Sequence, residues 1–200
     1  MDEYYKKTLE LYSNGGGWAG LYYGIFSKII NDNDFKKCAE VGIGYGFHAI
    51  ELLKNTNIEH LYLIDPMVPY DSRDQFEIDV VNNGGFESIV VKILNSLDEY
   101  KNRYTWFRKH SNQITNEEIP NNSLDAVFID GNHSYRAVTN DLELYWTKIR
   151  SGGYLLGDDY WMTSVNKAVN NFKNKNHLDV NFYTKSNGSS NYIIYGFIKP

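Results

Sequence analysis

The chain is poor in cysteine. Cys38 is the only cysteine among 200 residues, so no disulfide can form within the chain. A zinc site built on thiolates would need ligands that this chain does not have. A disulfide scaffold and a zinc finger are therefore both excluded.

Long apolar runs and an excess of positive charge are also missing. No stretch approaches the roughly 18 to 20 apolar residues of a membrane span, and residues 1–7 lack the apolar stretch of a secretory signal. We therefore expect a cytoplasmic protein without a membrane partner. The 20 Lys and Arg are outnumbered by 25 Asp and Glu, which gives a net charge of −5 and argues against a nucleic-acid partner.

The composition is that of a globular protein. A hydrophobic content of 42% in 200 residues suits one domain with a substantial core. We expect a single domain over residues 1–200, with an N-terminal helical cap over residues 1–35 that is interrupted by glycines at 15–17. The stretch 95–122 is long for a connection between two strands, and we expect it to form a substrate-side insertion.

Strand-like and helix-like runs alternate along the chain. Short apolar runs predict strands at 36–41, 60–64, 88–94, 124–129 and 153–156. Helical patterns between them predict helices at 47–54, 71–81, 97–110, 135–149 and 163–173. This alternation is typical of an α/β fold with a parallel sheet and helices on both faces. Two final strands, 180–184 and 192–198, flank Asn187-Gly188 and predict an antiparallel hairpin at the sheet edge.

A glycine-rich turn follows the first predicted strand, with the sequence Glu40-Val41-Gly42-Ile43-Gly44-Tyr45-Gly46. Glycines at a strand-to-helix turn let a ligand approach the main-chain N–H groups of the helix. A dinucleotide fingerprint would need a glycine where Phe47 stands. The acidic Glu40 favours a cofactor with a positive amino-acid end, and Asp65, 23 residues after Gly42, is placed to accept both hydroxyls of a ribose. The predicted ligand is a nucleoside without a pyrophosphate.

These residues resemble the cofactor motif of class I S-adenosylmethionine-dependent methyltransferases. The segments 128–135 and 151–160 are similar, more narrowly, to a group of small-molecule O-methyltransferases, several of which use a divalent metal. The resemblance implies a Rossmann-like, mostly parallel sheet of seven strands in the order 3-2-1-4-5-7-6, with the last strand antiparallel.

The resemblance also assigns roles to the cofactor residues. It implies that Glu40, Gly42, Gly44 and Gly46 hold the methionine part of S-adenosylmethionine and that Asp65 binds its ribose. Asp130 would lie at the same edge of the sheet. We expect Asn95 and Ser96, read as following the third strand, near the adenine, although both could simply cap the next helix.

Three acidic residues end two neighbouring predicted strands. Asp130 ends the fourth strand, and Asp158 and Asp159 end the fifth, about 4.8 Å away in a sheet. Converging carboxylates repel one another unless they take up protons or bind a hard cation such as Mg²⁺ or Mn²⁺. In the metal-dependent O-methyltransferases that the chain resembles, the matching acids bind Mg²⁺. An acid that caps a helix or faces solvent is the alternative.

His133 lies three residues after Asp130, where catechol-type relatives carry a lysine base. Its imidazole titrates near physiological pH, so we expect it to take the proton of the acceptor hydroxyl, with Asp130 beside it. The alternative is that His133 only caps or packs the following helix.

The predicted function is S-adenosylmethionine-dependent, metal-assisted O-methylation of a small hydroxylated molecule, with a sugar, nucleotide sugar or glycan favoured over a catechol. Basic and aromatic residues at 101–109 predict either a solvated helix face or a flap that meets an anionic or ring-shaped substrate. The alternatives are a non-catalytic binding module with the same fold and an RNA methyltransferase. The sequence leaves the oligomeric state open, a homo-oligomer included.

Overall fold

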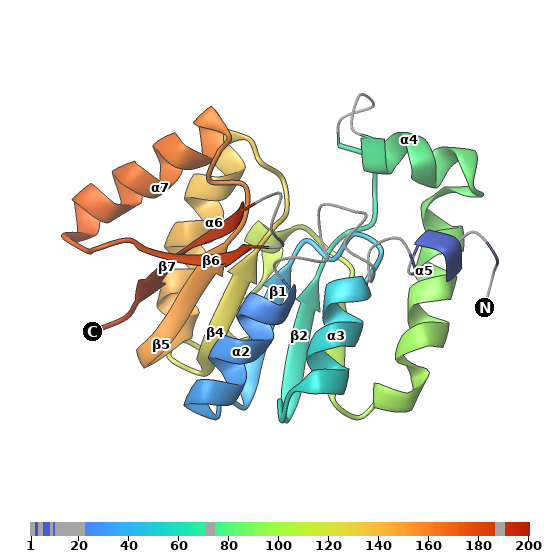
Figure 1. Cartoon of the computed structure of the whole chain (residues 1–200), viewed down its shortest axis with the longest axis horizontal. Coiled ribbons are helices and arrows are strands. Elements are labelled where there is room, and N and C mark those ends of the chain that lie inside the picture. Colours follow the sequence, from blue (N-terminus) through green and yellow to red (C-terminus); the bar gives the residue numbers. More distant parts are fainter. Residues whose placement is uncertain (1–2, 4–5, 9, 11–22, 71–74, 187–190) are drawn as a thin grey trace.

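The computed structural model describes residues 3, 6–8, 10, 23–70, 75–186 and 191–200. Within these residues, seven strands form one sheet in the order β3-β2-β1-β4-β5-β7-β6 (Figure 1). Neighbouring strands from β3 to β5 are parallel, and β7 is antiparallel to both β5 and β6. The fold class and strand order predicted from the sequence are therefore confirmed.

The strands are β1 Lys37–Val41, β2 His60–Ile64, β3 Tyr104–Phe107, β4 Leu124–Ile129, β5 Ile149–Gly157, β6 Asn181–Ser186 and β7 Asn191–Ile198. The described helices are α2 Tyr23–Asn33, α3 Phe47–Asn55, α4 Gln75–Asn82, α5 Gly85–Leu97, α6 Tyr135–Lys148 and α7 Thr163–Asn176, with short 3₁₀ helices η1 Asp98–Tyr100 and η2 Ser111–Gln113.

Helices cover both faces of the sheet and create two apolar cores. Buried residues of α2, α3 and α5 pack on one face together with Cys38 of β1. Residues of α6 and α7 pack on the other face together with Ala39 and Val41. Because successive side chains of a strand point to opposite faces, a central strand covered on both sides is apolar along its whole length. This explains why β1, β2 and β4 were recognisable in the sequence.

The structure corrects one strand and one helix. Residues 88–94, predicted as a strand, belong to α5, and β3 lies within residues 97–110, predicted as a helix. Ile89, Val90, Ile93 and Leu97 are buried along one side of α5, at helical spacing, although this run is rich in β-branched residues. Tertiary packing has thus overridden local β propensity.

The true third strand is fixed to its neighbours by Arg103. The Arg103 guanidinium donates hydrogen bonds to the carbonyl oxygens of Leu53, Thr56 and Ile58, beyond and at the end of α3. Residues 95–122 therefore contain the end of α5, β3 and η2, and part of the predicted insertion is an edge of the sheet.

The structure describes part of each end of the chain. Phe26 and Ile30 of α2 are buried against the sheet, within the predicted N-terminal cap. The antiparallel β6–β7 pair is confirmed. The glycines at 15–17 and the Asn-Gly turn lie outside the described residues, and a single domain over 1–200 stays a prediction. Among the described helices, none has the length and apolar character needed to cross a bilayer.

Asp141 generates a prediction about stability and pH. It is buried on α6 and accepts a hydrogen bond from Ser111 Oγ at 2.5 Å. Burial raises the pKa of Asp141 from 3.8 to about 6, and the Ser111 hydrogen bond offsets this only in part. The folded protein therefore holds this proton more tightly than the unfolded chain, so stability decreases as pH rises from about 4 through 6.

Asp141→Asn should remove this pH dependence. At pH 7.5 the variant is expected to be more stable by up to about 3 kcal/mol, and the difference should vanish near pH 4. Urea unfolding at four pH values between 4 and 7.5 measures this, with Glu143→Gln on the same helix as the control. A variant less stable than the wild type at pH 7.5 would contradict the account.

Candidate active site

The glycine loop joins β1 to α3 and needs left-handed backbone angles. Gly42 has φ +84°, Gly44 φ +49° and Gly46 φ +76°. A Cβ atom on Gly42 would lie 2.1 Å from the Asp130 carbonyl oxygen, so only glycine allows the loop to approach the end of β4 this closely. A Cβ on Gly44 would meet no atom within 4 Å. The loop is therefore packed against β4 at Gly42 and open at Gly44.

Asp65 holds the glycine loop at the end of β2. Its Oδ2 accepts a hydrogen bond from the Ile43 amide at 2.9 Å, and its Oδ1 accepts one from the Met67 amide at 2.7 Å. Burial raises the pKa of the Asp65 carboxyl, whereas the hydrogen bonds from Ile43, Met67 and Gly44 and the nearby His110 lower it. Asp65 thus connects the glycine loop to the end of β2, where the sequence predicts that a ribose binds.

Glu40 is buried beneath the loop together with His48. Glu40 is 2% exposed, and its Oε1 lies 3.0 Å from His48 Nδ1. Its Oε2 is buried and has no hydrogen-bond partner among the described residues. Burial raises the pKa of Glu40 and His48 lowers it. The ring centroid of His48 lies 5.7 Å from that of Phe26 in a tilted contact and 4.9 Å from that of Phe128 in an edge-on contact, and these contacts fix the imidazole.

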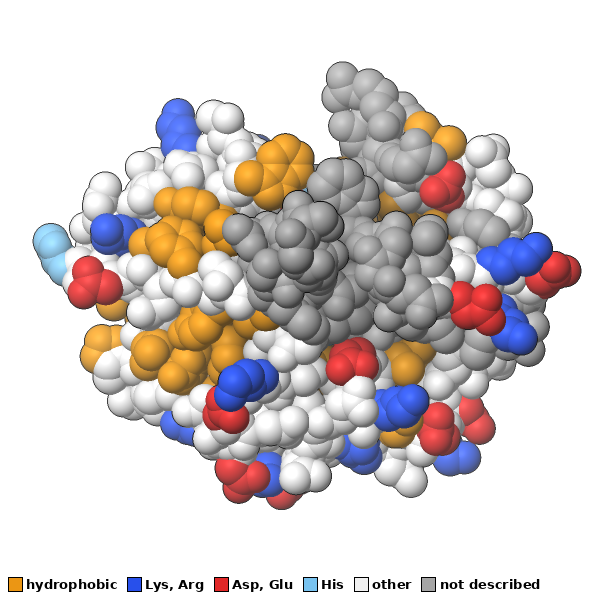
Figure 2. Space-filling view, in the orientation of Figure 1, with side chains coloured by type: hydrophobic (Ala, Val, Ile, Leu, Met, Phe, Trp, Pro, Cys, Tyr) orange, Lys and Arg blue, Asp and Glu red, His pale blue; other side chains and the backbone are white. Residues whose placement is uncertain are grey.

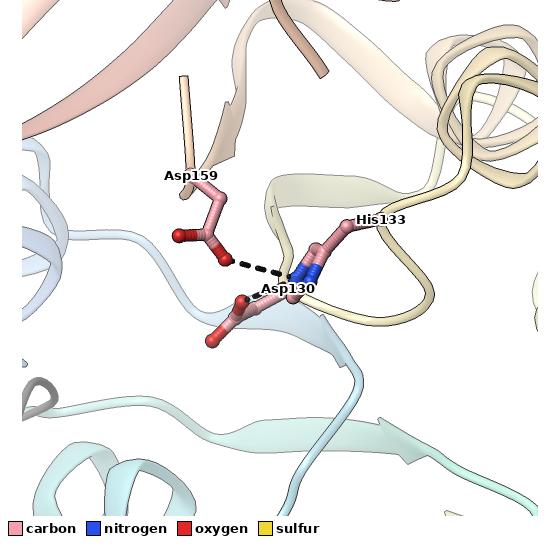
Figure 3. A group of neighbouring side chains, drawn as sticks. All are labelled: Asp130, His133 and Asp159. Atoms are coloured by element: carbon pink, nitrogen blue, oxygen red, sulfur yellow. Dashed lines mark hydrogen bonds and ion pairs between the residues drawn. The ribbon is translucent and has the colours of Figure 1, made fainter. Parts of the chain in front are cut away.

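A second group lies where β4 and β5 end. The side chains of Asp130, His133 and Asp159 point toward one another (Figure 3). His133 Nε2 lies 3.3 Å from Asp130 Oδ1 and 3.0 Å from Asp159 Oδ2. One ligand atom from each residue lies within 4.8 Å of the other two, a spacing that suits a metal ion. We call these three residues the acid–histidine cluster.

The alternative role of His133 as a helix cap is not observed. Ser134 is the N-cap of α6, and its Oγ accepts a hydrogen bond from the Ala137 amide at 3.3 Å. The N-cap is therefore Ser134 and not His133, whose side chain points into the acid–histidine cluster.

Asp158, the third member of the predicted metal trio, lies beside the acid–histidine cluster. Asp158 is 7% exposed, and its Oδ1 accepts a hydrogen bond from the Asp159 amide. Burial, Asp130 and Asp159 together raise the pKa of Asp158 to about 9. Asp159 has a left-handed backbone with φ +56°, an unusual conformation at the turn that follows β5. The group that the structure assembles contains His133 in place of Asp158.

Asn95 and Ser96 do not follow the third strand. They lie in the last turn of α5, before β3, and Ser96 Oγ donates to the Lys92 carbonyl oxygen at 2.9 Å. The premise for placing them near the adenine is therefore wrong. Because β3 ends at Phe107, the segment that follows it is 108–110, and His110 is close enough to Asp65 to lower its pKa. Sequence reasoning missed His110 because it misplaced β3.

Three of the four basic residues of the predicted flap are engaged within the protein. Arg108 forms an ion pair with Glu87, and Lys109 forms one with Glu118. Arg103 binds the backbone carbonyls described above. These side chains brace β3 and the segment that follows it.

A family comparison identifies the class of protein. The sequence model of a methyltransferase domain family matches residues 39–160, from β1 to the end of the Asp158–Tyr160 segment, which is more than half of the chain. The chain therefore belongs to this methyltransferase domain family, and the resemblance to class I methyltransferases drawn from the sequence is confirmed.

The chain is also similar to one curated protein, and it shares its fold with solved structures. An uncharacterized protein of Acanthamoeba polyphaga mimivirus is 28% identical over 156 residues, which are 75% of this chain and 66% of that relative. The O-methyltransferase of Bacillus cereus, solved in complex with S-adenosylhomocysteine, shares the fold with a TM-score of 0.63 and 10% identity, over 100% of this chain and 92% of that one. Aeropyrum pernix fibrillarin with bound S-adenosyl-L-methionine gives a TM-score of 0.53 and 10% identity, over 82% and 66%.

Gly42 and Gly44 give a matched pair of substitutions. Gly42→Ala combines the cost of a left-handed alanine with a backbone clash, and we expect a loss of about 3 kcal/mol and a melting temperature lower by about 10 °C. Gly44→Ala has no clash and should lose only about 1 kcal/mol. Thermal unfolding of both variants measures the difference. Equal losses would show that the contact between the loop and β4 does not constrain the fold.

Proposed function

We propose that this protein is an S-adenosylmethionine-dependent O-methyltransferase that acts on a hydroxyl of a small molecule. The observation that carries the proposal is the meeting of two groups at one edge of the sheet. The open glycine loop with Glu40 and Asp65 lies at the ends of β1 and β2, and the acid–histidine cluster lies at the ends of the adjacent β4 and β5. In open α/β sheets, ligands bind outside the carboxyl ends of the strands where the strand order reverses.

The residues beside the glycine loop suit a cofactor with a cationic amino-acid end. The buried, unpartnered Oε2 of Glu40 could accept from an ammonium group, and the space at Gly44 lets a ligand approach the backbone. Each Asp65 oxygen accepts from the backbone yet keeps a lone pair for a ribose hydroxyl. The cofactor-bound neighbours from B. cereus and A. pernix support this assignment through their common fold.

The acid–histidine cluster suits a divalent cation such as Mg²⁺ or Mn²⁺. Two carboxylates and one imidazole converge, and hard cations of this kind prefer oxygen ligands. A cation bound there would lower the pKa of the acceptor hydroxyl and orient it. His133 would serve as a ligand, because its Nε2 already lies between the two carboxylates, and this role takes precedence over that of a general base.

Methyl transfer to oxygen is an in-line displacement at the methyl group of the sulfonium. The protein must hold the acceptor oxygen about 3 Å from that carbon, on the side opposite to sulfur and in line with the carbon–sulfur bond. The short spacing between the glycine loop and Asp130, whose backbone amide donates to the Val41 carbonyl oxygen at 2.7 Å, would set this geometry. Among acceptors, we retain the preference for a hydroxyl on a sugar, nucleotide sugar or glycan.

The first test concerns the ribose contact. Asp65→Ala should weaken binding of S-adenosylhomocysteine by about 1.5 to 3 kcal/mol, or roughly 10- to 150-fold, because a charged acceptor is lost. Isothermal titration with this ligand and with its 2′-deoxyribose analogue separates a lost contact to the ribose from a change in the conformation of the glycine loop. The wild type should prefer the ribose compound and the variant should not. A preference that persists in the variant would refute the ribose role of Asp65.

The second test concerns the cation. Asp159→Asn and His133→Asn should each weaken Mn²⁺ binding at least about tenfold, while affinity for S-adenosylhomocysteine stays near that of the wild type. Calorimetric titration with Mn²⁺ measures this, and Asp179→Asn, an exposed acid outside the acid–histidine cluster, is the matched control. If His133→Asn binds Mn²⁺ as tightly as the wild type but transfers the methyl group more slowly, His133 is a general base and not a cation ligand.

Turnover separates the proposal from its alternatives. Release of S-adenosylhomocysteine in the presence of a hydroxylated acceptor is expected from an enzyme and not from a binding module. An RNA methyltransferase would need clustered basic residues for phosphate contacts. The basic side chains beside β3 are instead paired with Glu87, Glu118 and backbone carbonyls.

A further inference from the structure

An exposed tryptophan is hydrogen-bonded to the acid–histidine cluster. Trp161 is 74% exposed, the highest value among the large hydrophobic side chains of the described residues. Its indole Nε1 donates to Asp159 Oδ1 at 2.7 Å, while the other oxygen of the same carboxylate faces His133. A large apolar ring is therefore held next to the candidate cation site by a hydrogen bond, while most of its surface is exposed.

A second apolar surface lies at the β6–β7 hairpin, and the residue that precedes Trp161 contacts it. Tyr160, the residue before Trp161, contacts Phe182 edge-on with ring centroids 4.9 Å apart. Phe182 pairs with Tyr195 and Thr184 pairs with Ile193, so Phe182 and Ile193 are on the same face of the hairpin. Phe182 is 47% exposed and Ile193 is 45% exposed. On the face of the sheet that carries α2, hydrophobic side chains also gather over the region of β6 and β7 (Figure 2).

The hairpin rises beyond the edge of the sheet at which the site lies. Tyr195 of β7 pairs with Gly157, the last residue of β5. The β6–β7 pairing continues to Ser186 and Asn191, and Asn191 lies four residues before Tyr195 in β7. At about 3.3 Å per residue, the pairing extends about 13 Å past the end of β5. The hairpin thus forms a wall beside the segment that carries Asp159 and Trp161.

We infer that Trp161, with the wall of Tyr160, Phe182 and Ile193, is the acceptor-binding surface, and that the acceptor carries its hydroxyl on a ring whose apolar face stacks on the indole. This inference rests on the proposed function and specifies the substrate class of the same site. Aromatic faces bind flat apolar groups well, and a hydrogen-bonded indole loses little freedom when a ring stacks on it. Exposed apolar patches rimmed by polar residues mark binding sites.

The surface also explains how an acceptor hydroxyl would reach the reacting edge. Trp161 is bonded to Asp159, so a ring lying on the indole has its substituents next to the acid–histidine cluster. An acyclic diol could reach the same carboxylates but would gain nothing from the aromatic wall. The surface therefore selects for ring-bearing acceptors rather than for hydroxyl groups in general.

Binding to the full chain saturated with S-adenosylhomocysteine and Mg²⁺ tests the inference without turnover. The probes are catechol, methyl β-glucopyranoside and the acyclic glycerol, and the readout is the indole N–H resonance of Trp161, assigned with Trp161→Phe. We expect at least one ring probe to shift this resonance and to bind at least tenfold more tightly than glycerol. Which ring probe binds distinguishes an aromatic acceptor from a sugar.

Variants supply the controls. Trp161→Ala should weaken binding of the ring probe at least tenfold and leave the affinity for S-adenosylhomocysteine unchanged, whereas Trp161→Phe should stay within about threefold of the wild type. Ile198→Ala, an exposed apolar residue at the opposite end of β7, should change neither affinity.

Four results would overturn the inference. Ring probes that bind Trp161→Ala as well as the wild type would remove the tryptophan from the acceptor site. A wild-type dimer that Trp161→Ala converts to a monomer, measured by sedimentation, would make the apolar surface a contact between two copies. Binding of S-adenosylhomocysteine without binding of either ring probe would reject the acceptor surface alone. Failure to bind S-adenosylhomocysteine would reject the proposed function as well.

Discussion

The close approach of the glycine loop to the end of β4 is the constraint on which the site depends. At Gly42 there is no room for a side chain, because the Asp130 carbonyl oxygen occupies the place of a Cβ atom. The strand order reverses between β1 and β4, and their carboxyl ends meet at this contact. It brings a loop suited to a nucleoside cofactor next to the carboxylate of Asp130. Without it, the cofactor residues and the acid–histidine cluster would be two unrelated groups of polar side chains.

Carboxylates crowd this edge, and each is stabilised in a different way. Glu40 lies next to His48, and Asp65 accepts hydrogen bonds from backbone amides. Asp130 and Asp159 both contact His133. Asp158 is buried beside them, with its pKa raised to about 9. Crowded carboxylates favour positively charged ligands, which are what a sulfonium cofactor and a divalent cation supply. The same electrostatic argument therefore covers both halves of the site.

Much of this edge could be predicted from the sequence because buried parallel strands are apolar and end at polar residues. This placed Glu40, Asp65 and Asp130 correctly at the ends of β1, β2 and β4. The sequence could not show that residues 88–94 form part of α5 and that the third strand comes later. The β-branched run Ile89-Val90-Val91 is helical only because its tertiary neighbours bury one side of it. The left-handed turn at Asp159, with Asp158 buried and His133 in the cluster, likewise depends on contacts between segments distant in sequence.

The most direct measurement of the central claim is a crystal structure of the protein grown with S-adenosylhomocysteine and Mn²⁺, with anomalous diffraction to locate the metal. The account predicts the nucleoside over Gly44, with its ribose at Asp65 and its amino group at Glu40, and a manganese peak between Asp130 and Asp159. A cofactor bound away from the glycine loop, or manganese bound at another group of acids, would contradict the account.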